Sequence, residues 1–272
     1  MSRKRLKVGI IGCGTIGGEL ARACQSCLKA GVALVAICDQ DEARARTLNA
    51  GLNKKAAVLG LDKLIENCDL VVEAASARIS GVVLDRCIKR RRDCMIMSVG
   101  GLIGCEKLLE KAGDKGIKVY IPSGALCGID GLKSASSGRV DSVTLTTRKP
   151  PRGLEGAPYL KENRIDIGNI RGETVIFEGT AEEAIRGFPQ NVNVSAALGL
   201  AGLGARRTRV RIVTSPDYTK NAHEVEIEGE CGRIFTRTEN VPSKANPKTS
   251  ELAVFSAIAT LKAITSSVRI GT

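Results

Sequence analysis

The sequence is poor in aromatic residues and contains one histidine. Aromatic side chains make up 3% of its 272 residues, and tryptophan is absent. Most proteins that hold single-stranded nucleic acid stack the bases on aromatic rings, so we do not expect a nucleic-acid partner. Chemistry that requires an imidazole has one candidate in this chain, His223.

Long apolar runs are also missing, since none approaches the ~18 residues of a membrane-spanning helix. The first apolar stretch, residues 8–11, runs into glycines and lacks a small-residue cleavage site, so it predicts a strand and turn rather than a signal peptide. We therefore expect a cytoplasmic protein with no membrane partner. The ten cysteines should then stay reduced. Cys24 and Cys27 lack the second pair of a zinc ribbon, so no metal site is predicted.

Basic residues outnumber acidic ones, 41 against 29, which gives a formal net charge of +12. Much of the excess lies in two runs, residues 89–92 and 206–211. The first run ends a predicted helix, the second alternates along a predicted strand, and neither is interleaved with aromatic residues. Both are expected to be solvated surfaces, and the net charge also suits a small anionic ligand.

The first part of the chain alternates apolar runs with helical patterns. The runs predict buried strands at residues 6–11, 32–38, 70–75, 95–99 and 119–121. Helical patterns lie between them, at residues 14–30, 41–50, 80–91 and 106–112. Such alternation is typical of an α/β fold with a parallel sheet covered by helices on both faces. We therefore predict a Rossmann-type dinucleotide-binding domain over residues 1–125.

A glycine motif lies between the first predicted strand and the first predicted helix. In this position the first glycine allows a tight turn, the second lets a pyrophosphate approach the backbone, and the third lets helix and strand pack closely. The helix N-terminus then offers free N–H groups to the phosphates. The predicted dinucleotide contacts in the motif are Gly12, Gly14, Thr15, Ile16 and Gly17.

The second predicted strand ends at Asp39. A carboxylate in this place accepts hydrogen bonds from the ribose hydroxyls of an adenosine and repels a 2′-phosphate, which favours NAD over NADP. The nearby Arg44 and Arg46 weaken that preference, so NADP stays possible. Ala75 and Ser76 follow the next predicted strand and should flank the cofactor, because ligands bind at the carboxyl ends of parallel strands.

The pattern changes after residue 125. Alternating, β-branched segments at residues 140–147, 174–177, 209–213, 223–228 and 233–238 predict a mostly antiparallel sheet with one wet face. Two helices interrupt the strands, one opened by a capping box at Thr180 and Glu183 and one at residues 191–203. We predict an α+β domain for substrate binding and dimerisation over residues 126–240.

Residues 241–272 are expected to form a long helix that packs back on the first domain. Asn246 is the predicted N-cap, and Pro247 is the predicted first-turn residue. The apolar positions with helical spacing predict its buried face: Leu252, Phe255, Ile258, Ala259, Leu261 and Ile264.

His223 shares one face of its predicted strand with Val225 and Ile227, while Glu224 and Glu226 lie on the other face. The sequence leaves two interpretations open. His223 is either a hydrogen-bonded core residue, or the group that exchanges a proton near neutral pH in a catalytic site.

Two polar clusters open predicted helices. The first contains Asn191, Asn193 and Ser195, and the second contains Asn246, Lys248, Thr249 and Ser250. Hydroxyl, amide and ammonium groups beside free helix N–H groups suit an anionic substrate. Ordinary helix capping explains the same residues equally well.

Several longer motifs resemble the L-aspartate dehydrogenase family, and the resemblance runs nearly from end to end. They are more specific than the glycine motif: Gly124-Ala-Leu-Cys-Gly-Ile-Asp-Gly-Leu132, Arg148-Lys-Pro-Pro151, Gly156-Ala-Pro-Tyr159, Phe188-Pro-Gln-Asn-Val-Asn-Val-Ser195, Asn221-Ala-His-Glu224, Glu239-Asn-Val-Pro-Ser243 and Asn246-Pro-Lys-Thr-Ser250.

The resemblance implies NAD(P)-dependent oxidation of L-aspartate through iminoaspartate to oxaloacetate and ammonia, a reaction that could also run in reverse and feed NAD biosynthesis. It implies a homodimer formed through the second domain. It also makes His223 catalytic, and it makes Ala125 and Asn193 cofactor contacts. The residues expected to hold the dicarboxylate substrate are Asn193, Ser195, Lys248, Thr249 and Ser250.

Two alternatives stay open on the sequence. One is a related oxidoreductase or imine reductase that acts on another small dicarboxylate. The other is a non-catalytic NAD-binding sensor. The polar cluster at residues 246–250 and the lone His223 favour an enzyme, because a sensor needs neither.

Overall fold

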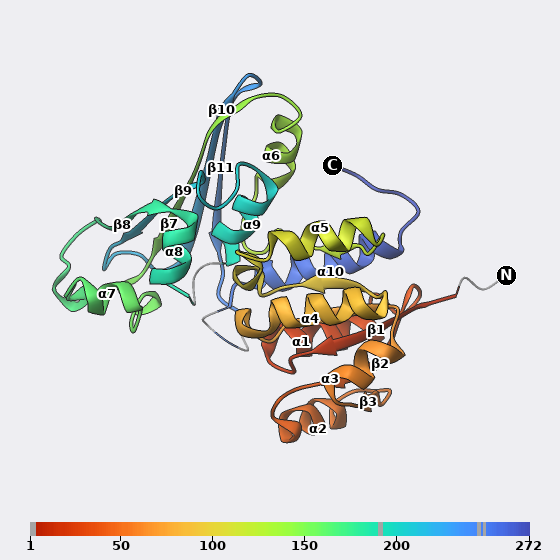
Figure 1. The fold of residues 1–272 in the computed structure, drawn as a ribbon. Helices are drawn as coiled ribbons and strands as arrows, with labels where there is room; N and C mark the ends of the chain where they lie inside the picture. The colour runs from red at the N-terminus through yellow and green to blue at the C-terminus, as the bar shows by residue number, and fades with distance from the viewer. Residues whose placement is uncertain (1–3, 190–192, 244–245, 247–248) are drawn as a thin grey trace. The chain divides into compact units, whose positions relative to one another are not determined.

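The computed structural model describes residues 4–189, 193–243, 246 and 249–272. The chain forms two compact units (Figure 1). The first unit contains Met1–Pro122 and Val254–Arg269, and the second contains Ser123–Ala253 and Ile270–Thr272. Each unit has its own sheet and its own hydrophobic core.

The first unit is built on a six-stranded parallel sheet. Its strands are β1 (Leu6–Ile11), β2 (Val32–Cys38), β3 (Ala57–Val58), β4 (Leu70–Glu73), β5 (Asp93–Ile96) and β6 (Val119–Tyr120). They lie in the order β3-β2-β1-β4-β5-β6. This is the doubly wound order of a dinucleotide-binding fold, in which the direction of strand addition reverses between β1 and β4. The predicted Rossmann-type domain is therefore confirmed.

Helices cover both faces of this sheet. They are α1 (Thr15–Gln25), α2 (Glu42–Ala50), α3 (Leu61–Asn67), α4 (Ala77–Arg90) and α5 (Glu106–Asp114). Val8 and Ile10 point into a core shared with α1. Gly9 faces α3, where an added Cβ would lie 2.6 Å from the Leu64 side chain. Successive residues of β1 thus face opposite sides of the sheet, and each side is covered by its own layer of helices.

Several boundaries in this unit differ from the prediction. The first helix ends at Gln25, because the amides of Ser26 and Leu28 both bond back to the carbonyl of Ala23 and close the last turn. Strand β5 begins at Asp93, and Val99 belongs to a short 3-10 helix. The prediction missed β3 and α3, which are too short to give a clear periodic signal.

The second unit contains a five-stranded sheet in the order β11-β10-β7-β9-β8. Its strands are β7 (Val140–Lys149), β8 (Thr174–Thr180), β9 (Arg209–Thr214), β10 (Asn221–Gly229) and β11 (Gly232–Asn240). Of the neighbouring pairs, β7 and β9 run parallel and the others antiparallel, so the predicted mostly antiparallel sheet is confirmed. Its helices are α6 (Ile129–Ala135), α7 (Pro158–Glu162), α8 (Ala181–Gly187) and α9 (Asn193–Ala201).

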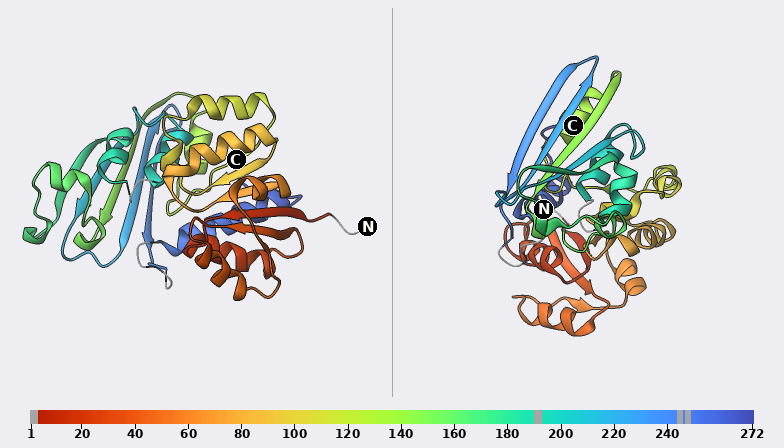
Figure 2. Two further views of the ribbon diagram at one scale, coloured as in Figure 1. Left: turned by 60° about the horizontal axis from the view of Figure 1, so that its bottom comes forward. Right: turned by 90° about the vertical axis from the view of Figure 1, so that its left-hand side faces the viewer.

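The helices of the second unit lie to one side of its strands, as the right-hand view of Figure 2 shows. The core on that side includes the rings of Tyr159, Phe177 and Phe188, whose centroids lie 5.2–5.6 Å apart. Helix α8 begins at the predicted capping box, since Thr180 and Glu183 exchange hydrogen bonds in both directions. The sheet thus has one dry face, against the helices, and one wet face.

The last helix, α10 (Glu251–Thr265), starts later than predicted. The amides of Asn246 and Thr249 bond to the carbonyls of Ser243 and Asn246, and Pro242 pairs with Ser250, so this segment turns back on itself before the helix. Asn246 is therefore not its N-cap, and Pro247 lies outside the described residues.

The buried face of α10 also differs from the prediction. Val254, Ala257 and Leu261 are buried, whereas Phe255 is 58% exposed and Ala259 is exposed. Of the predicted positions, Leu261 is buried and Ile258 and Ile264 pack against the core of the first unit, so the prediction is confirmed there and wrong for Phe255 and Ala259.

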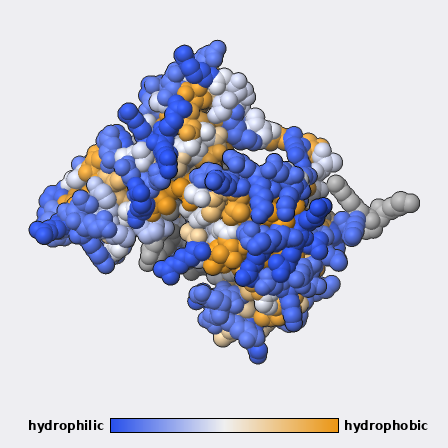
Figure 3. Space-filling model, viewed as in Figure 1, coloured by the Kyte–Doolittle hydropathy of each residue, from blue (hydrophilic) through white to orange (hydrophobic). Residues whose placement is uncertain are grey.

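No helix of the described ranges has the length and apolar character needed to cross a membrane. On the face shown in Figure 3, hydrophobic residues form small patches among hydrophilic ones. In the same described ranges, no group of three or more His, Cys, Asp or Glu side chains is placed to hold a metal ion.

Candidate functional site

A pocket of about 450 Å³ lies in the first unit, at the carboxyl ends of β1, β2 and β4. This is the position that ligands occupy in doubly wound sheets, where the strand order reverses. Five residues predicted from the sequence to contact a dinucleotide line it: Gly12, Gly14, Asp39, Ala75 and Ser76.

The glycine motif shapes the floor of the pocket. Gly12 has φ +95°, and an added Cβ would lie 2.5 Å from the carbonyl oxygen of Ala74. An added Cβ on Gly17 would lie 1.8 Å from the carbonyl oxygen of Gly12, so both positions require glycine. Gly14 is different, because its Cβ would meet nothing within 4 Å. Open space at this position leaves room for a ligand against the backbone.

Helix α1 begins directly after Gly14, and Thr15 and Ile16 are its first, half-buried residues. No side chain caps this N-terminus, so its first N–H groups are not consumed by a capping side chain. Uncapped amides with the positive end of the helix dipole form an anion site. Together with the space at Gly14, they fit the pyrophosphate of a dinucleotide.

Asp39 is fixed on the pocket wall by two backbone amides. Its Oδ2 accepts a hydrogen bond from the Cys13 amide at 2.7 Å, and its Oδ1 accepts one from the Asp41 amide at 2.9 Å. A carboxylate has about four acceptor positions, so further hydrogen bonds from ribose hydroxyls are possible. The exposed Arg44 lines the same pocket and brings a positive charge beside this carboxylate.

Glu73 is a buried carboxyl group at the end of β4, with 0% of its surface exposed. Its Oε1 accepts hydrogen bonds from the amides of Ala75 and Ser76 at 2.8 and 3.0 Å and from the Ser98 hydroxyl at 2.9 Å. Its Oε2 accepts one from the Ser98 amide at 3.0 Å. Burial raises the pKa of Glu73, and these hydrogen bonds oppose the rise. Glu73 thus holds the ends of β4 and β5 together behind the pocket.

His223 lies on the dry face of β10 in the second unit and is 5% exposed. It pairs with Thr147 of β7, whose Oγ1 lies 3.1 Å from Nδ1 of the ring. Among the described residues, no side chain or backbone group bonds to its other nitrogen, Nε2. Burial, and secondly the charge of Lys149, lower the pKa of His223 to about 3. The imidazole is therefore neutral at neutral pH, with one donor and one acceptor nitrogen.

A chain of polar contacts connects three of the predicted residues. The carbonyl of Ala125 accepts a hydrogen bond from Asn240 Nδ2 at 2.9 Å, and Asn240 Oδ1 accepts one from the Ser250 hydroxyl at 2.9 Å. The Thr238 hydroxyl lies 3.3 Å from the carbonyl oxygens of both Ala125 and His223. Ala125, His223 and Ser250 are distant in sequence, but the structure places them in one network.

The other predicted substrate residues are placed less uniformly. Ser195 is 2% exposed on α9 and lines a small cavity with Thr147 and Lys149. Asn193 is the exposed first residue of α9. Thr249 is half-buried in the turn before α10. Asn191 and Lys248 lie outside the described residues.

The predicted carboxylate site at a helix N-terminus beside Asn246 is corrected by this geometry. Helix α10 begins at Glu251, so Thr249 does not lie in its first turn, and the Ser250 hydroxyl is bonded to Asn240. Ser250 directly precedes α10, and a role of Thr249 and Ser250 in holding an anion stays a prediction.

The sequence places Glu73 at the start of a loop expected to flank the cofactor but assigns no individual role to four polar residues that organise these groups: Glu73, Thr147, Lys149 and Asn240. Glu73 carried a signal, because it is a lone carboxylate at the end of an apolar strand run. The others have no local signal, since their role comes from partners far along the chain.

We predict that Glu73→Gln weakens dinucleotide binding. A neutral amide cannot accept at both ends, so it loses hydrogen bonds to the Ala75–Ser76 loop or to Ser98. Because a hydrogen bond to a charged group is worth ~1.5–3 kcal/mol, the Kd for NADH should rise about 10-fold or more. NADH fluorescence titration measures the Kd, and Glu110→Gln on the exposed side of α5 is the control. An unchanged Kd in a folded Glu73→Gln protein contradicts the role assigned to Glu73.

Comparison with known proteins agrees with this arrangement. A sequence profile described as "Aspartate dehydrogenase, C-terminal" matches residues 130–264, and one described as "Homoserine dehydrogenase, NAD binding domain" matches residues 12–122. The L-aspartate dehydrogenase of Methanosarcina mazei is 47% identical over 98% of this chain and 100% of its own length. That of Bradyrhizobium diazoefficiens is 39% identical over 98% of this chain and 94% of its own length.

A solved structure gives the same result. The crystal structure of aspartate dehydrogenase from Thermotoga maritima has a TM-score of 0.75 and 27% sequence identity to this chain. The match covers 98% of this chain and 100% of that one. Full-length relatives with more than a third of their residues identical share their fold and their domain content with this protein. The chain therefore belongs to the aspartate dehydrogenase family.

Proposed function

We propose that this protein is an L-aspartate dehydrogenase that oxidises L-aspartate, through iminoaspartate, to oxaloacetate and ammonia with a pyridine nucleotide. The observation that carries the proposal is the 47% identity to an enzyme of that name over 98% of this chain. The polar network at His223 supports it, because Thr147 contacts the imidazole and Thr238 connects the backbone carbonyl of His223 with that of Ala125.

The first unit would bind the dinucleotide. Gly12, Gly14 and the N-terminus of α1, with Thr15 and Ile16, would hold the pyrophosphate, and Asp39 would accept hydrogen bonds from the adenosine ribose. Ala75 and Ser76 line the same pocket, and Glu73 fixes their loop. When bound, the nicotinamide supplies the acceptor for the hydride of the substrate Cα.

The second unit would supply the proton chemistry. We assign His223 as the catalytic residue, because Nδ1 is held by Thr147 while Nε2 has no hydrogen-bond partner among the described residues. The neutral ring can take a proton from the water that attacks iminoaspartate and return it to the leaving ammonia. A bound dicarboxylate brings negative charge, which raises the pKa of an imidazole toward the working range.

The proposal also includes the residues that hold the substrate and the remaining cofactor contacts. Ala125 and Asn193 are proposed cofactor contacts, and Ala125 is supported by its fixed carbonyl. Asn193, Ser195, Lys248, Thr249 and Ser250 are proposed to hold the two carboxylates of the substrate. Of these, Ser250 is the best supported, because its bond to Asn240 connects it to the His223 network.

We also propose that NAD is preferred to NADP. The Asp39 carboxylate is fixed by two amides at 2.7 and 2.9 Å and cannot move aside without losing both bonds. A 2′-phosphate would meet this negative charge, and Arg44 would offset the repulsion only in part.

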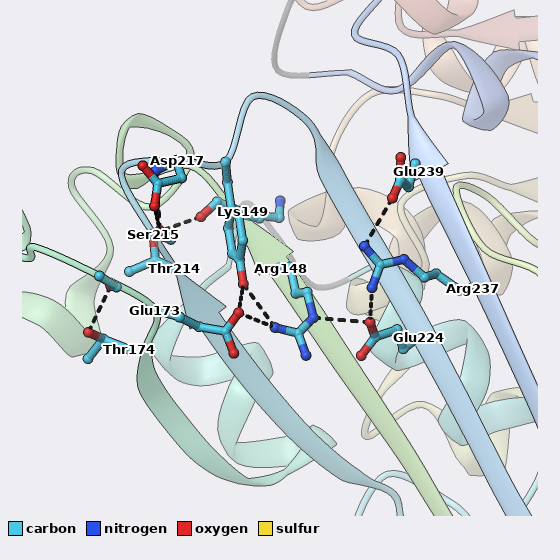
Figure 4. Close-up of polar contacts among 12 residues, drawn as sticks. Arg148, Lys149, Glu173, Thr174, Thr214, Ser215, Asp217, Glu224, Arg237 and Glu239 are labelled. Carbon is cyan, nitrogen blue, oxygen red and sulfur yellow. Dashed lines mark hydrogen bonds and ion pairs between the residues drawn. The ribbon is translucent and has the colours of Figure 1, made fainter.

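The proposed assembly is a homodimer formed through the wet face of the second sheet. Figure 4 shows the charged row on this face, in which Arg148 contacts Glu173 at 2.9 Å and Glu224 at 3.1 Å, and Glu224 also contacts Arg237. Phe235, on the same face, is 56% exposed and would be covered by a partner subunit at this interface. A monomeric mass at micromolar concentration in analytical ultracentrifugation would remove this part of the proposal.

The cytoplasm is the proposed location. All ten cysteines carry free thiols, which fits a reducing compartment that also supplies pyridine nucleotides. Recovery of the protein with an extracytoplasmic fraction of its source cells would contradict this location.

The activity itself is tested by following NADH oxidation with oxaloacetate plus ammonia, and NAD reduction with L-aspartate. We expect turnover in both assays and little turnover with other 2-oxo acids. Turnover restricted to another dicarboxylate would favour the related oxidoreductase, and tight NADH binding without any turnover would favour a sensor. His223→Ala should lower kcat by ~10²-fold or more while NADH binding is retained, because general acid–base catalysis contributes that much.

The cofactor preference is tested with two substitutions that should act in opposite directions. Asp39→Ser removes the carboxylate and should shift the ratio of kcat/KM for NAD over NADP toward NADP by about 10-fold, since hydrogen bonds to a charged acceptor are lost. Arg44→Ala should shift the ratio toward NAD. Equal ratios in Asp39→Ser and the unmodified enzyme would rule out Asp39 as the determinant.

A further inference from the structure

Lys149 is a lysine buried on the dry face of the second sheet, with 8% of its surface exposed. It ends β7, and strand alternation places it on the same face as Thr147, which is 3% exposed. In the register of β7 with β10, Thr147 lies directly opposite His223. The buried ammonium and the buried imidazole therefore lie about one pleat apart on neighbouring strands.

The surroundings of Lys149 fix where its side chain runs. The Thr214 hydroxyl donates a hydrogen bond to the Lys149 carbonyl at 2.7 Å, which holds the end of β7. An added Cβ on Gly153 would lie 3.7 Å from both Cβ and Cδ of Lys149, so the lysine stem packs against this glycine. Beyond the stem, Lys149, Thr147 and Ser195 line a cavity of about 10 Å³, roughly the space of one water molecule.

The neighbours of Lys149 and His223 differ between the two faces of the sheet. Arg148 and Glu224 alternate to the wet face, where they pair with each other at 3.1 Å. The other side chains around the cavity are uncharged: Leu145, Leu154, Ala184, Phe188, Val210 and Ile212. On strand β11, the uncharged Thr238 lies directly opposite His223. Among the described residues, Lys149 is the charged group that lowers the pKa of the imidazole, after burial.

A buried ammonium is costly, and an aliphatic side chain of similar size would fill this position with less loss of hydration. Packing alone therefore does not account for a lysine at residue 149. Burial lowers the pKa of Lys149 to about 8, so its charge changes within the pH range in which dehydrogenases work. Its positive charge is the second cause, after burial, of the lowered pKa of His223.

We propose that Lys149 is a positioning residue whose charge tunes the basicity of His223 from the neighbouring strand, so that ammonium and imidazole act as one coupled pair. The inference rests on the proposed function of His223 as the proton-handling group. When Lys149 carries its proton, its charge makes the imidazole less basic than burial alone does. When Lys149 loses the proton to solvent, the imidazole becomes more basic, so the reaction responds to pH through a residue that does not touch the substrate.

The single histidine makes the coupling directly observable. In protein labelled with 15N-histidine, the two imidazole nitrogen resonances belong to His223. We expect them to shift with a midpoint near pH 8, which reports the loss of the Lys149 proton. The step should disappear in Lys149→Met, which has no charge, and in Lys149→Arg, which stays charged throughout this range. Lys161→Met, on the exposed surface of the same unit, should retain it.

Absence of the step in the unmodified protein, or its persistence in folded Lys149→Met or Lys149→Arg, would overturn the proposal. Thermal unfolding of each variant establishes that it is folded, and two variants are used because either could fail to fold. The same ionisation should be absent from the pH profile of kcat/KM in both variants. The NMR titration needs no turnover, so an enzyme inactive toward L-aspartate would refute the proposed function and leave the coupling testable.

Discussion

The register between β7 and β10 is the constraint on which the chemistry of the second unit depends. Pairing Thr147 with His223 sends the imidazole to the dry face and, on the same strands, sends Arg148 and Glu224 to the wet face. A slip of one residue would exchange the faces and bury the charged row. The Arg148–Glu224 pair therefore stabilises the position of His223 indirectly, because it is satisfied only in the register that buries the histidine.

The architecture of both units was predictable because it follows from periodicity. Buried parallel strands are continuous apolar runs, and half-exposed strands alternate, so both sheets could be read from the sequence. The glycine motif was also predictable from the sequence. At Gly12 and Gly17 an added Cβ would collide with backbone atoms, so only glycine fits and the motif is visible in the residue types. The placement of His223 on an apolar face was also correct, because a two-residue period fixes the face without knowledge of the partner strands.

The remaining features depend on contacts between distant segments. Asn240 donates a hydrogen bond from its side-chain amide to the Ala125 carbonyl and accepts one from the Ser250 hydroxyl. Neither partner can be identified from the residues next to Asn240 in the sequence. Helix α10 was misplaced for a similar reason. Asn246 and Pro247 form a good local start signal, but Pro242 pairs with Ser250 and the helix begins only at Glu251. Phe255 is 58% exposed while Ala257 is buried, so the hydrophobicity of single residues does not fix which face of this helix is buried.

The net charge of +12 has two physically different components. Most basic side chains are solvated or form surface pairs, such as Arg86 with Asp62 at 2.8 Å, which contribute little to stability. Lys149 is the opposite case, a charge whose burial costs stability and makes its proton labile near pH 8. Since the lowered pKa means that the unfolded chain binds more protons, stability from this group falls as pH drops from about 10 through 8. The burial of Lys149 lowers the stability of the fold, but it also places the ammonium charge close to His223 in a region where water screens their interaction little.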